Sequence, residues 1–291
     1  MVALKQTFTI AGLNVEVFSD AGIASVSSGP VVAFFLLHGR LSSSKNVEHI
    51  AESLVQNRET QKSIDSQRRR DLIVITFDHR NHGTRLVDSN ANNGWSRHSD
   101  KNNDRHALDM YCIQTGTARD VSFLIDFLPA YLYPSNERTI STWGIGGISL
   151  GGHSTWISLC SDPRLKLGIP IIGCPDFLSL MAARAKKHSL PITPPYIPDS
   201  LLSYIRQRDP VSTPYDVQNA TNPFLGKKIL VLAGGMDTLV PYSAGKDFVE
   251  KLQVGTDGVK QVVIIPDAGH ECTPAMVAEM EKFIEKEALS I

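Results

Sequence analysis

Short apolar runs alternate with amphipathic stretches along most of this chain. Continuous apolar runs predict strands, and apolar residues at helical spacing predict helices between them. The predicted strands are residues 31–37, 72–77, 139–148, 167–172, 228–233 and 261–266, and the predicted helices are 44–55, 107–128, 150–160, 242–252 and 274–288. This alternation is typical of an α/β fold with a mostly parallel, doubly wound sheet.

Three local signals refine this pattern. Residues 7–10 and 14–18 flank an Ala-Gly-Leu turn and predict an opening hairpin. Pro129 predicts that the helix beginning at residue 107 ends near this proline. Pro170 predicts a bulge or a strand end, because proline cannot donate a hydrogen bond to a neighbouring strand.

The segment of about 175–223 differs from the rest because it is rich in proline. Its core would be too small to fold alone, so we expect a small cap inserted into a single domain that spans 1–291. It contains more apolar side chains than so short a piece can bury. We therefore expect some of them, including Met181 and Tyr196, to bind the apolar part of a substrate.

Composition and charge narrow the class of protein. The chain has 291 residues, 42% of them hydrophobic, and a formal net charge of -1, so no charge bias favours nucleic acid or an anionic membrane. The basic run at 68–70 lacks interleaved aromatic residues, which also argues against nucleic acid. No apolar run approaches the ~20 residues of a membrane helix, and the first residues do not resemble a secretory signal. The four cysteines are scattered, so we expect reduced thiols in a cytoplasmic protein.

The segment from Gly147 to Gly151 reads Gly-Ile-Ser-Leu-Gly, with Ser149 at its centre. An apolar strand precedes it and a helix follows, which is the context in which Gly-x-Ser-x-Gly forms a nucleophile elbow. A Gly-rich loop that binds phosphate is the alternative. No Lys-Ser/Thr pair follows the motif, so it is not a P-loop.

A serine nucleophile needs a base, and the base needs an orienting acid. Asp237 follows the strand of 228–233, and His270 follows the strand of 261–266. Parallel strands end at one edge of the sheet, so Ser149, Asp237 and His270 are expected to meet there. Asp267 is the second candidate for the acid. It lies only three residues from His270 and would leave the loop of Asp237 without a role.

Together with the His38-Gly39 pair and the Asp78-to-Arg85 loop, these motifs resemble the α/β-hydrolase superfamily. Within it, the chain is most similar to small esterases of the prolyl-oligopeptidase and dienelactone-hydrolase branch. The resemblance spans about 31–288 and implies an α/β-hydrolase fold. It also implies an oxyanion hole formed by the backbone N–H groups of Leu150 and Arg40.

Arg40 departs from the apolar or aromatic residue that this family often has there. Its guanidinium could pair with an anionic group of the substrate, or it could point to solvent or to a nearby acid. The cluster of Asp78, His79 and His82 could hold a metal, but its match to the hydrolase loop favours a structural turn.

The sequence therefore predicts a serine esterase that hydrolyses a carboxylic ester, or a thioester, through an acyl-serine intermediate. It implies no metal and no cofactor, and a small-molecule ester as the only partner. Peptidase activity is less expected, since no propeller precedes the core. A non-catalytic protein that binds a small molecule or a partner on the same fold is the alternative.

Overall fold

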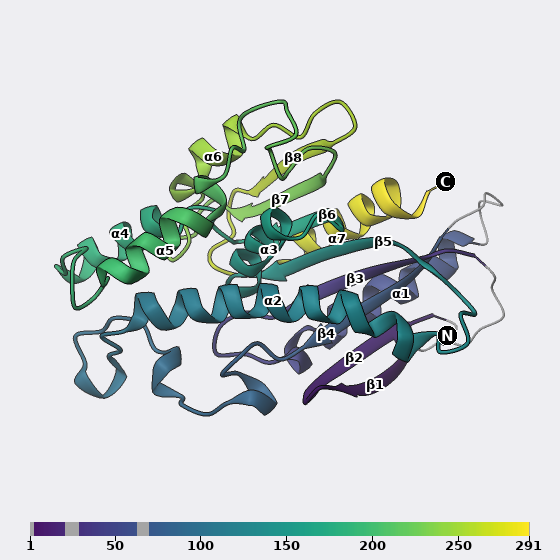
Figure 1. The fold of residues 1–291 in the computed structure, drawn as a ribbon, viewed down its shortest axis with the longest axis horizontal. Coiled ribbons are helices and arrows are strands. Elements are labelled where there is room, and N and C mark those ends of the chain that lie inside the picture. The colour runs from purple at the N-terminus through teal and green to yellow at the C-terminus, as the bar shows by residue number, and fades with distance from the viewer. Residues whose placement is uncertain (1–2, 21–28, 63–69, 291) are drawn as a thin grey trace.

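The computed structural model describes residues 3–20, 29–62 and 70–290 (Figure 1). Arg68 and Arg69 of the basic run lie outside these residues. Eight strands form one sheet in the order β1-β2-β4-β3-β5-β6-β7-β8, and β3 to β8 run parallel to one another. The strands are β1 (Leu4–Ile10), β2 (Leu13–Ser19), β3 (Val31–Leu37), β4 (Asp71–Phe77), β5 (Ile140–Ile148), β6 (Leu165–Ile171), β7 (Lys228–Gly234) and β8 (Val259–Ile265). The predicted mostly parallel sheet is confirmed, and the β1–β2 hairpin joins it antiparallel through β2.

Helices cover both faces of this sheet. One apolar cluster packs α2, α3 and α6 against one face, and a second packs α1 and α7 against the other. The helices are α1 (Glu48–Lys62), α2 (His106–Leu132), α3 (Leu150–Ser161), α4 (Phe177–His188), α5 (Asp199–Arg208), α6 (Lys246–Lys251) and α7 (Pro274–Ile284). Every side chain of β3 is buried, as expected for a strand between two layers of helices.

The two prolines have different consequences. The helix predicted over 107–128 and expected to end near Pro129 continues past this proline to Leu132. Leu132 and Tyr133 are buried in the core, and this packing offsets the hydrogen bond that Pro129 cannot donate. Pro170 lies inside β6 and pairs with Gly147 of β5, but the pairing with β7 is interrupted there, between Gly168 and Ile171. The predicted irregularity is therefore present as a gap on one side of the strand.

The prediction of one helix over 242–252 is also corrected. A 3₁₀ turn, Tyr242–Ala244, is followed by α6, and Gly245 separates them. A Cβ atom on Gly245 would lie 2.6 Å from Cδ of Pro175, so this tight contact admits only glycine. The contact links the start of α6 to the chain that leaves β6.

Helices α4 and α5 lie between β6 and β7 in sequence, within the segment predicted as a cap. Their apolar side chains do not form a core of their own. They join a third cluster that includes Met110 and Tyr111 of α2. In Figure 1 the two helices lie at the same end of the molecule as the long connection of residues 78–105. Trp95 from that connection meets Tyr196 edge to face, with ring centroids 6.2 Å apart.

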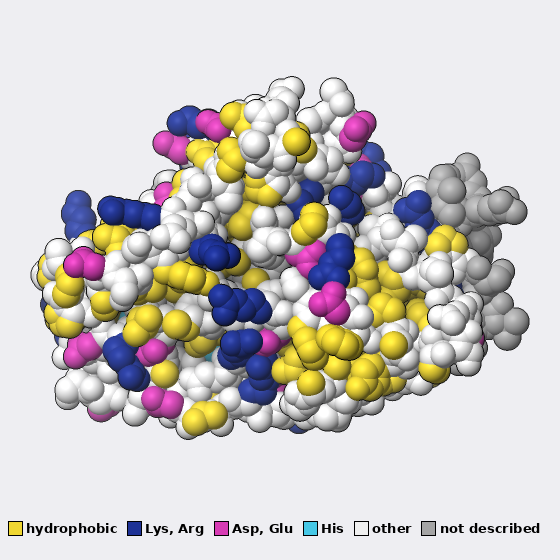
Figure 2. Space-filling view, in the orientation of Figure 1, with side chains coloured by type: hydrophobic (Ala, Val, Ile, Leu, Met, Phe, Trp, Pro, Cys, Tyr) yellow, Lys and Arg dark blue, Asp and Glu magenta, His cyan; other side chains and the backbone are white. Residues whose placement is uncertain are grey.

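Charged and hydrophobic side chains are unevenly distributed over the surface. On the face drawn in Figure 2, Lys and Arg side chains cluster at the centre, and hydrophobic side chains gather over the C-terminal half of α2 and the β1–β2 hairpin. Among the larger apolar residues, Leu4, Phe127 and Tyr131 are exposed. Across 3–20, 29–62 and 70–290, every helix is too short or too polar to cross a bilayer.

Candidate active site

Ser149 occupies a sharp turn between β5 and α3. Its backbone has φ 55° and ψ −106°, in the left-handed half of the map that a residue with a Cβ rarely adopts. A Cβ on Gly147 would lie 2.5 Å from the carbonyl carbon of Gly151, so the close approach of the two backbones requires glycine. This geometry is that of the nucleophile elbow, in which the strained turn exposes the serine hydroxyl.

The structure brings Ser149, His270 and Asp237 together. Oγ of Ser149 lies 2.8 Å from Nε2 of His270, and Nδ1 of His270 lies 2.7 Å from Oδ2 of Asp237. A carboxylate only accepts, so the proton of a neutral imidazole lies on Nδ1, and Nε2 is left to accept from the hydroxyl. The three side chains therefore form a continuous hydrogen-bonded chain that ends on a negative charge.

Asp237 is held as a carboxylate. Its side chain is fully buried, and Oδ1 accepts from the backbone N–H groups of Leu239 and Val240 at 2.9 and 2.8 Å. Burial by itself raises the pKa of this carboxyl, but the hydrogen bonds from His270 and the two N–H groups outweigh it and lower the pKa below its ordinary value. Asp267, the second candidate for the acid, is exposed.

The backbone around Ser149 leaves one donor available. The N–H of Ser149 donates to Ile171 at 2.9 Å, and that of Gly151 donates to His38 at 3.1 Å. Between them, the N–H of Leu150 is the first in α3 and has no carbonyl one turn earlier. A Cβ on Gly39 would lie 3.9 Å from Cβ of Ser149, so the loop before Arg40 runs beside the serine. The roles of Leu150 and Arg40 in an oxyanion hole stay predictions.

Two buried histidines support that loop. His38 accepts from the backbone N–H of His79 at 3.0 Å through Nε2, so its Nδ1 donates to the carbonyl of Gly39 at 2.7 Å. His79 donates from Nε2 to the carbonyl of His38 at 2.8 Å and accepts from Thr117. Burial lowers the pKa of His38 to about 4, and that of His79 falls well below its ordinary value. Both rings are neutral near pH 7 and fix the loop by hydrogen bonds.

Asp78 anchors the neighbouring turn. Its carboxylate accepts from the N–H of Ser44 and from both the N–H and the hydroxyl of Thr84, at 2.7 to 2.8 Å. Within the described residues, no group of three or more His, Cys, Asp or Glu side chains is arranged to hold a metal ion.

The side chain of Arg40 is half-buried and bonds to the connection of residues 78–105. Nη1 donates to the carbonyl of Asn92 at 2.8 Å, and burial lowers the pKa of the guanidinium. Arg40 lines a cavity of about 140 Å³ together with Gly94, Trp95, His106, Arg184, Lys187, His188 and Leu239. Leu239 belongs to the loop of Asp237, so the cavity adjoins both the predicted oxyanion loop and the loop of the acid.

Arg184 and His106 were not anticipated from the sequence as site residues. Arg184 is a buried cation on α4. It follows Phe177, Leu180 and Met181 at spacings of seven, four and three residues, so the sequence does place a charge on the apolar face of this helix. This charge among apolar positions could have marked Arg184 as a candidate site residue. Nothing in the sequence around His106, at the start of a long helix, marks it in this way.

The two predicted apolar contacts lie in different places. Met181 is fully buried in the cluster shared by α2, α4 and α5, and its burial favours a packing role. Tyr196 is half-buried and packs against Trp95, a wall of the cavity. A substrate contact by either residue stays a prediction.

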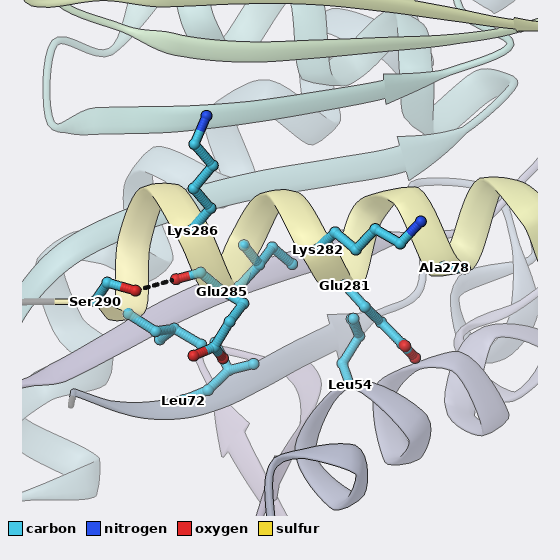
Figure 3. Close-up of a pocket in the computed structure, with 10 residues that line it drawn as sticks. Leu54, Leu72, Ala278, Glu281, Lys282, Glu285, Lys286 and Ser290 are labelled. Atoms are coloured by element: carbon cyan, nitrogen blue, oxygen red, sulfur yellow. Dashed lines mark hydrogen bonds between the residues drawn. The ribbon is translucent and has the colours of Figure 1, made fainter. Parts of the chain in front are cut away.

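A larger hollow of about 510 Å³ lies away from these residues, between α1, β4 and α7 (Figure 3). Leu54, Leu72 and Ala278 form part of its wall, and Glu281 and Lys282 stand at its rim (Figure 3). It includes none of Ser149, Asp237 and His270.

Comparisons with known proteins agree with this fold. Residues 116–288 match the prolyl oligopeptidase family, and this match covers more than half of the chain. The chain belongs to that family and is a serine hydrolase of the α/β-hydrolase fold. A search of curated proteins gives no significant match.

Solved structures with the same fold differ widely in sequence. TT1662 from Thermus thermophilus aligns with a TM-score of 0.65 and 17% identity over 98% of both chains. An acylaminoacyl peptidase from Pyrococcus horikoshii aligns with a TM-score of 0.56 and 14% identity over 99% of this chain but 42% of its own. A cold-adapted esterase from an Arctic intertidal metagenomic library aligns with a TM-score of 0.54 and 16% identity, over 97% of this chain and 92% of its own.

Proposed function

We propose that this protein is a serine esterase with Ser149 as nucleophile, His270 as general base and Asp237 as the residue that orients the histidine. The observation that carries the proposal is the hydrogen-bonded chain from the strained Ser149 through His270 to the buried Asp237 carboxylate. A serine hydroxyl is a weak nucleophile unless a base removes its proton, and this arrangement supplies one.

In the first half of the reaction, Oγ of Ser149 attacks the ester carbonyl as its proton moves to Nε2 of His270. The negative charge on Asp237 stabilises the imidazolium, and the N–H groups of Leu150 and Arg40 bind the tetrahedral oxyanion. Collapse of this intermediate breaks the bond to the alcohol oxygen, which takes the proton from His270. The products are the free alcohol and an acyl-Ser149 ester.

In the second half, His270 takes a proton from water as the water attacks the acyl carbonyl. The new tetrahedral intermediate returns the Ser149 oxygen as leaving group, and His270 reprotonates it. The carboxylic acid leaves, and the resting arrangement of the site is restored. A thioester would follow the same steps with a thiol as leaving group.

An ester or thioester is a better proposal than a peptide for two reasons. An alkoxide or thiolate leaves more readily than an amine. The cavity beside Arg40 has a volume of about 140 Å³, which fits a small group. A non-catalytic binding role is disfavoured because binding needs neither a strained serine nor an oriented histidine.

The test compares para-nitrophenyl esters of increasing acyl length with the corresponding para-nitroanilides. We expect steady-state hydrolysis of the esters, with a burst of para-nitrophenol where deacylation is slow, and anilide rates at least ~100-fold lower. Anilide turnover as fast as ester turnover would point to a peptidase. Binding of the esters without turnover would support the non-catalytic alternative.

A further inference from the structure

The cavity beside the proposed nucleophile contains a buried positive charge. Arg184 is 8% exposed, and its Nε is buried with no hydrogen-bond partner. Its Nη2 donates to the carbonyl of Leu239 at 3.3 Å, and its Nη1 lies 3.2 Å from Nε2 of His106. These contacts hold the guanidinium in place, but neither of them is made to an anion.

His106 cannot neutralise Arg184. Its Nδ1 lies 3.1 Å from the carbonyl of Asn93, to which it donates, so Nε2 is free to accept from Arg184. Burial, followed by the charges of Arg184 and Arg40, lowers the pKa of His106 to about 3. The ring is therefore neutral near pH 7 and acts only as a hydrogen-bond acceptor.

A second guanidinium increases the local charge. Arg40 lines the same cavity, and burial together with the charge of Arg40 lowers the pKa of Arg184 to about 10. Among the described residues, no carboxylate forms an ion pair with either arginine. Asp237 is near enough to act on Arg184 through its charge, but its oxygens are occupied by His270 and the backbone. Lys187 adds a third cation at the rim.

Burying a cation without a counter-ion costs free energy, which a bound anion would recover. We propose that Arg184 and Arg40 form a subsite for a carboxylate on the substrate, so that the natural ester carries a free acid group in its acyl or its alcohol part. This inference rests on the proposed function, because it names the class of ester that the site accepts.

A carboxylate on a carbon chain fits this cavity better than a phosphate. Arg40 uses one of its five N–H groups on the carbonyl of Asn92, and Arg184 uses two on His106 and Leu239. Both guanidinium groups line the cavity and retain N–H groups that can donate to an anion. Trp95 and Leu239 give the cavity apolar walls suited to the carbon chain that bears it.

The experiment measures kcat/KM for matched pairs of esters. The mono-para-nitrophenyl esters of adipic, pimelic and suberic acids are each compared with the para-nitrophenyl ester of the monocarboxylic acid of equal length. A second pair, 3-acetoxyphenylacetate and its methyl ester, carries the acid on the leaving group. We expect at least one anionic ester to be preferred by ~10- to 100-fold, the range for a hydrogen bond to a charged group.

Arg184→Gln removes the proposed charge, and Lys186→Gln is its matched control. Lys186 is exposed on the same helix and does not line the cavity. We expect the ratio of anionic to neutral kcat/KM to fall by ~10-fold or more in Arg184→Gln and to stay within ~2-fold in Lys186→Gln. Arg184→Lys retains the charge without the planar fork, so an intermediate ratio is expected. Thermal unfolding checks that each variant is folded.

The outcomes separate this inference from the proposed function. A folded Arg184→Gln variant with an unchanged ratio would overturn the subsite, as would a wild-type protein without any preference in both sets of pairs. The wild-type comparison decides the matter if Arg184→Gln does not fold. Stronger competitive inhibition by inorganic phosphate than by adipate would overturn the choice of carboxylate. Failure to hydrolyse either kind of ester would instead refute the esterase proposal.

Discussion

Arginines occur in pairs in two places near the carboxyl edge of the sheet, and only one pair is neutralised. Arg80 and Arg85 share Asp120, with both ion pairs at 2.8 Å, and the side chain of Arg80 is 46% exposed. Arg184 is buried and Arg40 is half-buried, and neither has a carboxylate partner among the described residues. The desolvation cost is therefore largest at Arg184, whose charge lacks such compensation. We interpret Arg80 and Arg85 as a structural link between a loop and α2, and Arg40 and Arg184 as a ligand site.

The largest expected effect tests whether Ser149 is the nucleophile. Ser149→Ala should lower kcat on neutral and anionic esters alike by ~10⁴- to 10⁶-fold, because it removes the nucleophile. Ester hydrolysis with purified variant measures this, and circular dichroism checks the fold. Retention of a tenth of the wild-type rate would show that the reaction does not use this serine.

A smaller loss of activity is expected when the carboxylate of Asp237 loses its charge. Asp237→Asn should lower kcat by ~10⁴-fold, because an amide in this place favours the wrong tautomer of His270. Asp267→Asn is the control, since that carboxyl is exposed and belongs to the same edge. An equal loss of kcat in the two variants would contradict the assignment of Asp237, and not Asp267, as the acid that orients His270.

The comparison itself is sharpened by changing one arginine of each pair. Arg40→Gln should lower the ratio of anionic to neutral kcat/KM by ~10-fold, because its guanidinium faces the cavity. Arg85→Gln should leave that ratio unchanged, because the charge of Arg85 is already neutralised by the ion pair with Asp120. Equal changes in the two variants would mean that long-range charge, and not a built subsite, sets the preference.

The last effect is on stability and not on activity, and it concerns a buried acid that can lose its charge, as an arginine cannot. Burial raises the pKa of Asp209 to about 8, although the N–H of Phe177 donates to it at 2.8 Å. Between its unfolded pKa of about 4 and the folded value, the unfolded chain releases a proton that the folded protein keeps. The stability contributed by this group is complete below about pH 4 and is lost as pH rises to about 8, by ~1.4 kcal/mol per pH unit at most.

Asp209→Asn should therefore flatten the decline of unfolding free energy across this window. Urea unfolding at the two ends of the window measures the slope, and Asp216→Asn, at an exposed position, is the control. An unchanged slope in Asp209→Asn would mean that the carboxyl is ionised in the folded protein.

The sequence was informative where one local pattern decides the structure. Continuous apolar runs predicted the central strands, and glycines at 147 and 151 predicted the turn that holds Ser149. The meeting of Asp237 and His270 followed from the rule that parallel strands end at one edge. Each of these inferences needs only a short stretch of chain or the direction of a strand.

Features that depend on packing between distant segments could not be predicted. Pro129 stays inside α2 because the residues after it are buried by other elements. The cavity beside Arg40 combines a loop after β3, the connection of 78–105, α4 and the loop of Asp237. Arg184 could be recognised as a charge on an apolar face, but its partners lie in segments that no sequence pattern connects.

The most direct test of the central claim is covalent labelling with a fluorophosphonate, followed by mass spectrometry of the proteolysed protein. We predict one label per chain, on the peptide that contains Ser149, and none in Ser149→Ala or in protein unfolded before exposure to the probe. A label on another residue, or none on the folded wild-type protein, would contradict the assignment of Ser149 as the nucleophile.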